Sequence, residues 1–504
     1  MHSKYGATAA RFVTLLVVGL VLSMAAAQTH LNIAMPGSTG APADPQRASD
    51  MGAYTVAEMI ADTLVIYADN EYQPALAESW STSADGTQHT FNLRPGVTFH
   101  NGEPLTAEAV VFNFERIMNP EDPLHAAGQL TAVTNLEALD ELTFRITLGS
   151  VDPDFILKLT NVWMVAPGSV GGDSAPVGSG PFQITRYLPD QQIDLVRYDD
   201  YWGGTPVFET ASIRNIPEPG TLVLELEAGA VDLITFAPNS HVHRLEGLGF
   251  SPMLFGSVNT AVLAINNATV TDTDLRRAIC YALDRDVLLN NVYAGMGRPQ
   301  TTLALPEGWA YNPDVPGFNY DPERAIEILE AAGYVDTNGD GIREKDGVPL
   351  NLDFQARGDG EWLLATQVMQ QFLGDVGIGT TITASDRDTY YANIRTGAYD
   401  LGWWLSNAQP EPPIVEYVFH SEDYWNVVQF HRPEVDELVT LGRSTPDQEV
   451  RAEGYRELQQ IFFDEAIQCQ QFWVQQAHVL SPELEGVVTT SRGALLYPHL
   501  WRFK

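Results

Sequence analysis

The stretch 72–120 constrains the fold more than any other part of the chain. It reads YQPALAESWSTSADGTQHTFNLRPGVTFHNGEPLTAEAVVFNFERIMNP. Turn signals at Ala84-Asp85-Gly86 and Pro95-Gly96 flank a segment from Gln88 to Leu93 that alternates as a half-buried strand does. A further reversal at Asn101-Gly102 follows a short extended piece. The pattern predicts strands joined by turns, followed by a helix.

The predicted helix begins after Thr106, whose side chain is a good N-cap. Glu108 lies in its first turn, where the helix dipole favours an acid. The residues Val110, Val111 and Phe114 recur at helical spacing and are expected to face a core. None of the residues in 72–120 forms a catalytic motif, so this segment indicates a scaffold and not a reaction.

The order and the residues of these pieces resemble bacterial extracellular solute-binding proteins of family 5, the peptide/nickel/opine class of ABC importers. Members of that family carry a close relative of "LAxSWxxSxDGxxxTFxLRxGVxFHxGxPxTAxDVVxxxxR". The resemblance implies an α/β, two-lobed periplasmic-binding-protein-like fold (type II, cluster C), with an extra small domain inserted in the first lobe. A protein of this kind captures a solute and has no catalytic step.

Further blocks extend the resemblance over nearly all of the chain. Residues 177–182 and 195–204 are similar to "GTGPY…LxRNPDYWGG", and 274–285 is similar to "VRxAIxYAIDR". Within the last block we expect Arg276 and Arg285 to be surface or domain-joining arginines, with contact to a ligand as the alternative.

The resemblance implies domain boundaries and a hinge. Lobe I is predicted to hold 28–53, 171–268 and 485–504, the inserted outer domain 54–170, and lobe II 269–484. At least two strands are expected to cross between the lobes.

The N-terminal residues have the parts of a secretory signal peptide. Lys4 and Arg11 precede the apolar run 12–22, and Ala25-Ala26-Ala27 supplies small residues for cleavage. The run is shorter than a membrane span. We therefore expect 1–27 to be removed and the protein to be periplasmic or extracellular, with no lipid anchor because no cysteine lies near the cleavage site.

The charge balance excludes some partners. The chain has 28 Lys and Arg against 65 Asp and Glu, a formal net charge of −37. Nucleic acid and anionic membrane surfaces are disfavoured as partners. The acids are scattered, which indicates a solvated surface, although they are also able to attract a cationic ligand.

The two cysteines, Cys280 and Cys469, lie in apolar surroundings. They are expected to be buried thiols, with a disulfide as the alternative in an exported protein.

Several catalytic motifs are missing from the sequence. It contains no H-E-x-x-H, C-x-x-C or G-x-S-x-G pattern, and no lysine follows a glycine as in a phosphate-binding P-loop. The chain is therefore not the ATP-hydrolysing subunit of a transporter. An exported hydrolase that uses paired carboxylates remains an alternative. The histidines show no metal-ligand spacing.

One acidic segment resembles the first half of a calcium loop. Asp336, Asn338 and Asp340 alternate, and Gly341 supplies a sharp turn. The twelfth position is Gly347 and not the bidentate acid that completes such a loop. A structural calcium ion and a plain surface turn both fit this pattern, and no other cofactor is expected.

In the family, the ligand contacts the loop after the first strand, which here contains Thr39, and a segment that corresponds to 399–413. Peptide-binding members have an aspartate shortly after a Gly-Trp pair, where it holds the peptide amino terminus. Depending on the alignment, Ser406 or Gln409 occupies that position here. The missing carboxylate puts ordinary peptides in doubt. The expected ligand is a peptide or another polar solute, and the alternative is an oligosaccharide or other neutral solute.

Two adjacent tryptophans precede that position. Because successive side chains of a strand point to opposite faces, only one of Trp403 and Trp404 is able to face the ligand, and core packing is the alternative for both. An aromatic face beside neutral hydrogen-bonding groups suits a polar uncharged solute. The other candidate contacts are Ser406, Asn407, Gln409, Trp425 and Asn426. The expected partners are a small solute, either an oligopeptide or an oligosaccharide, and the transmembrane subunits of an ABC permease, with the protein as a monomer.

Overall fold

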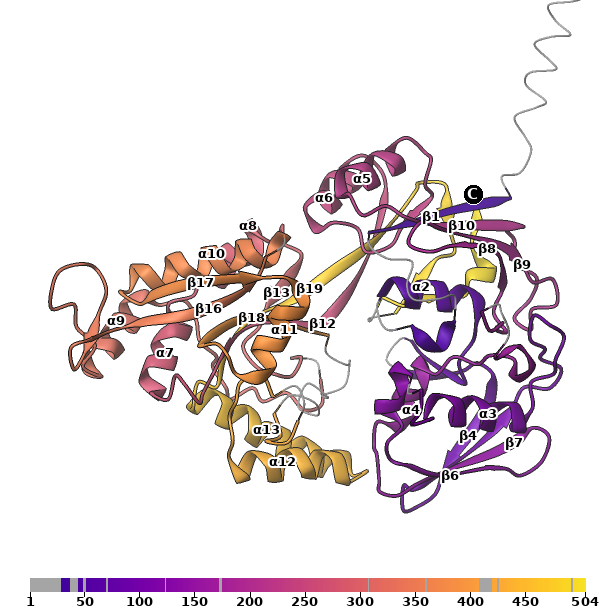
Figure 1. Ribbon diagram of the computed structural model, residues 1–504, viewed down its shortest axis with the longest axis horizontal. Coiled ribbons are helices and arrows are strands. Elements are labelled where there is room, and N and C mark those ends of the chain that lie inside the picture. The colour runs from indigo at the N-terminus through magenta and orange to yellow at the C-terminus, as the bar shows by residue number, and fades with distance from the viewer. Residues whose placement is uncertain are drawn as a thin grey trace, which may run out of the picture.

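The computed structural model describes residues 29–36, 44–48, 51–68, 71–122, 124–171, 175–306, 308–358, 360–407, 419–423, 426–490 and 493–504. Figure 1 shows two lobes of mixed α/β structure joined by two long strands. Within these residues no helix has the length and apolar character needed to cross a membrane.

A single eleven-stranded sheet runs through both lobes. Its strands in lobe I are β1 (His30–Met35), β8 (Phe182–Leu188), β9 (Gln192–Arg197), β10 (Thr210–Asn215) and β11 (Leu233–Ile234). Its strands in lobe II are β13 (Gly297–Pro299), β16 (Asn351–Arg357), β17 (Gly379–Ser385) and β18 (Leu401–Asn407). Two longer strands, β12 (Ser251–Ile265) and β19 (Gln468–Leu480), belong to both lobes.

The hinge consists of β12 and β19, which pair antiparallel along most of their length. At the lobe I end Phe255 is opposite Gln476, and at the lobe II end Asn259 is opposite Val474. The register shifts between these two pairs, where Gly256 has a φ of 82°, a conformation that glycine adopts without strain. The expected crossing strands are therefore present, and their ladder is interrupted between the lobes.

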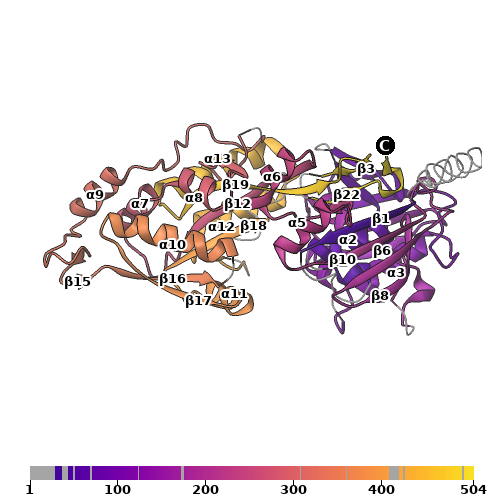
Figure 2. The same cartoon turned by 90° about the horizontal axis from the view of Figure 1, so that it is seen from above.

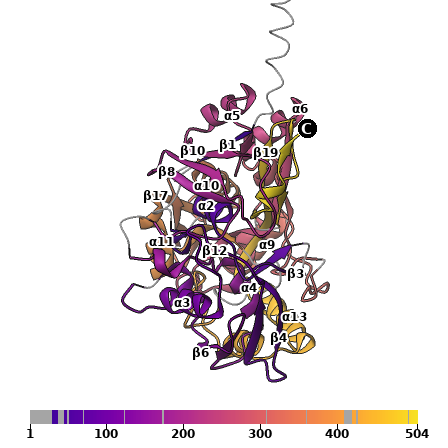
Figure 3. The same cartoon turned by 90° about the vertical axis from the view of Figure 1, so that its right-hand side faces the viewer.

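The stretch 72–120 belongs to a separate domain below the lobe I sheet (Figures 1 and 3). Its antiparallel sheet has the order β4-β5-β7-β6. Thr106 caps α3 as predicted, accepting a hydrogen bond from the Ala109 amide, and Val110 and Phe114 are buried. Val111 is only half-buried. The bounds are β4 (Ala77–Thr82), β5 (Gln88–Leu93), α3 (Ala107–Ile117), β6 (Val133–Ala138), β7 (Thr143–Leu148) and α4 (Phe155–Lys158).

Helices cover the sheet in both lobes, and Figure 2 shows those of lobe II from above. In lobe I they are α5 (Pro219–Glu227) and α6 (Asn239–Gly247), and α2 (Met51–Ile60) lies at the border of lobe I with the inserted domain. In lobe II they are α7 (Thr273–Tyr281), α8 (Arg285–Asn291), α9 (Pro322–Ala331), α10 (Gly360–Asp375), α11 (Arg387–Thr396), α12 (Pro433–Ser444) and α13 (Gln448–Asp464). The remaining strands are short hairpin pieces: β2 (Val65–Ala68), β3 (Glu71–Pro74), β14 (Glu344–Lys345), β15 (Val348–Pro349), β20 (Leu484–Glu485), β21 (Val488–Thr489), β22 (Leu495–Leu496) and β23 (Arg502–Phe503).

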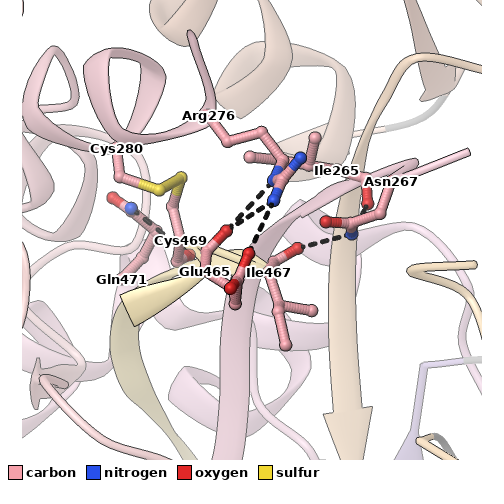
Figure 4. Close-up of a disulfide and its surroundings, with 8 residues drawn as sticks. All are labelled: Ile265, Asn267, Arg276, Cys280, Glu465, Ile467, Cys469 and Gln471. Atoms are coloured by element: carbon pink, nitrogen blue, oxygen red, sulfur yellow. Dashed lines mark hydrogen bonds and ion pairs between the residues drawn. A yellow bond between two sulfur atoms is a disulfide. The ribbon is translucent and has the colours of Figure 1, made fainter. Parts of the chain in front are cut away.

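A disulfide joins Cys280 of α7 to Cys469 of β19, so the expectation of two free thiols is wrong (Figure 4). The two Cα atoms are 5.1 Å apart, although 189 residues separate them in sequence. The expectation failed because burial in an apolar cluster, which both residues share, is equally compatible with a thiol and with a bridge.

Arg276 reinforces the same junction, since its guanidinium donates to the Glu465 carbonyl at 2.7 and 3.1 Å. Arg285 donates to the Gln300 carbonyl at 2.5 Å. Both arginines therefore join structural elements, as expected.

Candidate functional site

A cavity of about 420 Å³ lies in lobe I, on its border with the inserted domain. Helix α2 and residues 160–163, directly after α4, form part of its lining. Figure 1 shows α2 and α4 on the side of lobe I that faces lobe II. The side chains that dominate the lining are Tyr54, Glu58, Asp62, Tyr67, Trp163, Tyr201, Trp202, Tyr497 and His499. The volume is within the range of cavities that bind small molecules.

Aromatic rings make up much of the cavity lining. The rings of Tyr54 and Trp163 are 5.2 Å apart, and Tyr201 lies 5.4 Å from Trp202 and 5.1 Å from His499. Gly203 permits this packing, because a Cβ there would lie 2.6 Å from the Tyr201 ring and 3.2 Å from the His499 ring. The Trp-Gly pair that marked the family in sequence thus shapes one side of the cavity.

Asp62 places a carboxylate among these rings. Its oxygens accept hydrogen bonds from the Tyr201 hydroxyl at 2.9 Å, the Trp202 indole N–H at 3.0 Å and the Ser179 hydroxyl at 2.9 Å. Burial raises the pKa of Asp62 to about 6, against the lowering effect of these three hydrogen bonds. Sequence reasoning missed this residue, and its one signal was an acid shortly after the end of helix α2.

The two tryptophans predicted for the site lie on opposite faces of β18, as expected, and in different core clusters. Trp403 has no exposed surface, and its indole N–H donates to the Tyr293 hydroxyl at 2.9 Å. Trp404 is 9% exposed, and its ring packs edge-on against Tyr391 with centroids 5.8 Å apart. Neither side chain lines the lobe I cavity. Trp403 is a packing residue of lobe II.

The other predicted contacts are only partly described. Ser406 and Asn407 end β18, where they are opposite Thr260 and Asn259 of the hinge strand β12. Asn426 is buried and donates to the carbonyl oxygens of His420 and Phe430 at 3.2 and 3.3 Å. Thr39, Gln409 and Trp425 lie outside the described residues.

The acidic turn has a fourth member that sequence reasoning missed. The carboxylates of Asp336, Asp340 and Glu344 have oxygens within 4.8 Å of one another. The Asn338 amide instead donates to Glu344 at 2.6 Å. Both oxygens of Asp336 accept backbone N–H groups, from Gly339 at 2.6 Å and from residue 341 at 3.0 Å. The turn thus satisfies its own carboxylates, and calcium binding there stays a prediction.

An ion pair joins the lobes away from the hinge strands (Figure 1). The Arg451 guanidinium of α13 donates to both carboxylate oxygens of Asp154, at 3.1 and 3.3 Å. Asp154 precedes α4 in the inserted domain. Both side chains are at least nine-tenths buried, and the guanidinium also lies over the Trp309 ring at 5.3 Å. We call this contact the cross-lobe ion pair.

The two-strand hinge, the paired lobes and the cavity of lobe I define a two-lobed binding protein. The family model described as "Bacterial extracellular solute-binding proteins, family 5 Middle" matches residues 71–426, which is more than half of the chain. The chain therefore belongs to the bacterial extracellular solute-binding proteins of family 5, whose members are binding proteins that serve ABC importers.

Individual relatives match over most of their length. The heme-binding protein A of Haemophilus influenzae is 29% identical, over 84% of this chain and 83% of its own. The nickel-binding periplasmic protein of Escherichia coli is 27% identical, over 92% of both chains. The crystal structure of NikA from Brucella suis in complex with Fe(III)-EDTA superposes with a TM-score of 0.86 at 26% identity, covering 94% of this chain and all of that one.

Proposed function

We propose that the protein captures a small solute between the lobe I cavity and the facing surface of lobe II, and delivers it to the transmembrane subunits of an ABC permease without catalysis. The observation that carries the proposal is the aromatic cavity of about 420 Å³ on the lobe I side of a two-strand hinge. The similarity to relatives supports a small solute, since they include heme-binding, nickel-binding and dipeptide-binding proteins.

Closure of the lobes is the proposed working step. A ligand that contacts both lobes favours the closed state by the free energy of those additional contacts. The lobe II contacts are expected from the end of β18, at Ser406, Asn407 and Gln409, together with Trp425, and Thr39 is expected on the lobe I side. The cross-lobe ion pair adds to the closed arrangement.

The same proposal includes export and a monomeric state. Residues 1–27 act as the cleavable signal peptide, and the processed protein works outside the inner membrane. Lobe I comprises 28–53, 171–268 and 485–504, the inserted domain 54–170, and lobe II 269–484.

A thermal-shift panel on the processed protein tests this function. The panel contains di- to pentapeptides, oligosaccharides, heme and nickel chelates. A solute at 100 times its Kd is expected to add about 2.7 kcal/mol to the free energy of unfolding. The substitution Tyr54→Ala in the cavity should abolish the shift. The matched control Tyr320→Ala, at a residue 46% exposed on lobe II, should preserve it. Turnover of the bound solute, or a shift that survives Tyr54→Ala unchanged, would contradict the proposal.

A further inference from the structure

The lobe I cavity is acidic. Among its described lining residues, Glu58 and Asp62 carry carboxylates, and there is no lysine or arginine. His499 is neutral at pH 7, because burial lowers its pKa. The Arg94 guanidinium lies over the Trp202 ring at 4.5 Å, but its own hydrogen bonds go to the Ala75 carbonyl and the Glu78 carboxylate. A solute that enters this cavity therefore meets negative charge without a built-in counterion from the described lining.

The hydrogen bonds of Asp62 leave room for one more partner. A carboxylate has about four acceptor positions, and three are filled by Tyr201, Trp202 and Ser179. All three donors are neutral, and no described basic side chain forms an ion pair with Asp62. A poorly solvated carboxylate held in this way gains strongly from a cation at the remaining position.

The aromatic rings add a second attraction for positive charge. Tyr54, Trp163 and Tyr201 line the same cavity, and aromatic rings attract ammonium groups through their faces, most strongly where water is excluded. The combination of ring faces with an unpaired carboxylate is the usual chemistry for recognising organic cations. A neutral sugar would leave the carboxylate charge uncompensated.

We propose that Asp62 recognises an ammonium group of the solute, so that the ligand class is an amine or quaternary-amine compound of small-molecule size. This inference rests on the proposed function and names its ligand. It also supplies an acid for a site in which Ser406 or Gln409 stands where peptide-binding relatives have an aspartate. The acid is contributed by lobe I and not by the strand end of lobe II.

The competing explanation is that Asp62 only holds the Tyr201–Trp202 pair in place. Two substitutions separate the two roles. Asp62→Asn removes the charge and keeps the size and an acceptor oxygen. Tyr201→Phe removes one donor to Asp62 and keeps both the ring and the charge. A purely positioning role predicts similar losses from both substitutions, whereas ammonium recognition predicts a charge-selective loss from Asp62→Asn alone.

The experiment is calorimetric titration with probe pairs that differ in charge. Choline is compared with 3,3-dimethylbutan-1-ol, and alanyl-phenylalanine with N-acetyl-alanyl-phenylalanine. At least one cationic probe is expected to bind the wild type ten-fold or more tighter than its neutral partner. Asp62→Asn should remove that difference, and Tyr201→Phe should retain it. Glu58→Gln provides a second charge-removing variant, with a smaller expected loss, if Asp62→Asn fails to fold.

The pH dependence gives a readout that a positioning role would not move. Affinity for the cationic probe should fall as the pH drops through about 6, where Asp62 becomes protonated. The other ionisable groups beside it are Glu58, Tyr201, Tyr497, His499 and Arg94. Affinity for a neutral probe should stay level over this range.

Three outcomes would overturn the inference: equal binding of charged and neutral probes, equal weakening of both by Asp62→Asn, or no binding of any cationic probe. If a neutral or anionic solute from the wider thermal-shift panel binds instead, the inference fails and the proposed function stands. If no solute of any class stabilises the protein, both fail.

Discussion

Lobe I and lobe II use their aromatic and polar residues in opposite ways. In lobe I, Asp62 lines an open cavity beside tyrosine and tryptophan rings. In lobe II, Trp403 is enclosed in the core, and a disulfide in the same core cluster joins α7 to the hinge strand β19. In lobe II the large aromatic residue stabilises the core, whereas in lobe I polar and aromatic side chains line a cavity that a ligand is able to enter. Large aromatic residues that stand out in a sequence are not thereby ligand contacts.

The largest expected effect comes from removing the Cys280–Cys469 disulfide in lobe II. The double substitution Cys280→Ala with Cys469→Ala opens a loop of 189 residues and should lower the free energy of unfolding by about 4 kcal/mol. Urea denaturation monitored separately in each lobe would show the loss in lobe II. Wild-type protein treated with reductant serves as the control. An equal loss of stability in both lobes would contradict the claim that the disulfide stabilises lobe II in particular.

The cross-lobe ion pair tests how strongly the lobes depend on each other. Arg451→Met leaves the Asp154 carboxylate buried without its partner, and should cost about 3 kcal/mol. Affinity for the solute should fall by about ten-fold if the pair supports the closed state, equivalent to about 1.4 kcal/mol. Calorimetry measures the free energy of unfolding and the solute affinity, and small-angle scattering reports the closure of the lobes.

The matched control for that variant is Arg456→Met on the same helix, where the guanidinium is 39% exposed and the ion pair with Glu449 is a surface contact. Arg456→Met should change neither the free energy of unfolding nor the affinity for the solute. Identical scattering from wild type and Arg451→Met would show that the ion pair does not influence closure.

A smaller effect distinguishes packing from binding in lobe II. Trp403→Phe removes the hydrogen bond to Tyr293 and leaves unfilled volume, which should cost about 2 kcal/mol of stability. Solute affinity should stay within two-fold of the wild type, since Trp403 has no exposed surface. Thermal unfolding measures the loss of stability, and titration calorimetry measures the solute affinity. A large loss of affinity with unchanged stability would reverse the role assigned to this tryptophan.

The smallest expected effect is the pH dependence of lobe I. The pKa of Asp62 is raised to about 6, so the folded state binds a proton more tightly than the unfolded chain does. The free energy of unfolding should therefore rise by about 1 kcal/mol from this group as the pH falls from 7 to 5. Asp62→Asn should lose that increment. Parallel pH profiles for the two proteins would mean that Asp62 is well solvated in lobe I.

Local patterns predicted local structure well. The turn signals and the Thr106 cap specified β5 and α3, because each involves residues only a few positions apart. The disulfide, the Glu344 carboxylate and the Asp62 cavity were not predictable in this way. Each depends on segments that are distant in sequence or on a chain path that the pattern does not contain. Tyr201 and Trp202, for instance, reach Asp62 from 139 and 140 residues away.

The interrupted ladder between β12 and β19 has a mechanical consequence. The register of this ladder shifts between Phe255 and Asn259 and again between Ala261 and Val262. The two lobes are expected to rotate relative to each other at this irregular stretch, and displacement grows with distance from it. Helix α13 contacts the inserted domain away from the hinge strands, and α9 lies at the far end of lobe II (Figures 1 and 2). Both helices are therefore displaced when the angle at the joint changes. A small change of angle near Gly256 is thus amplified by leverage into a large sweep of the tip of lobe II.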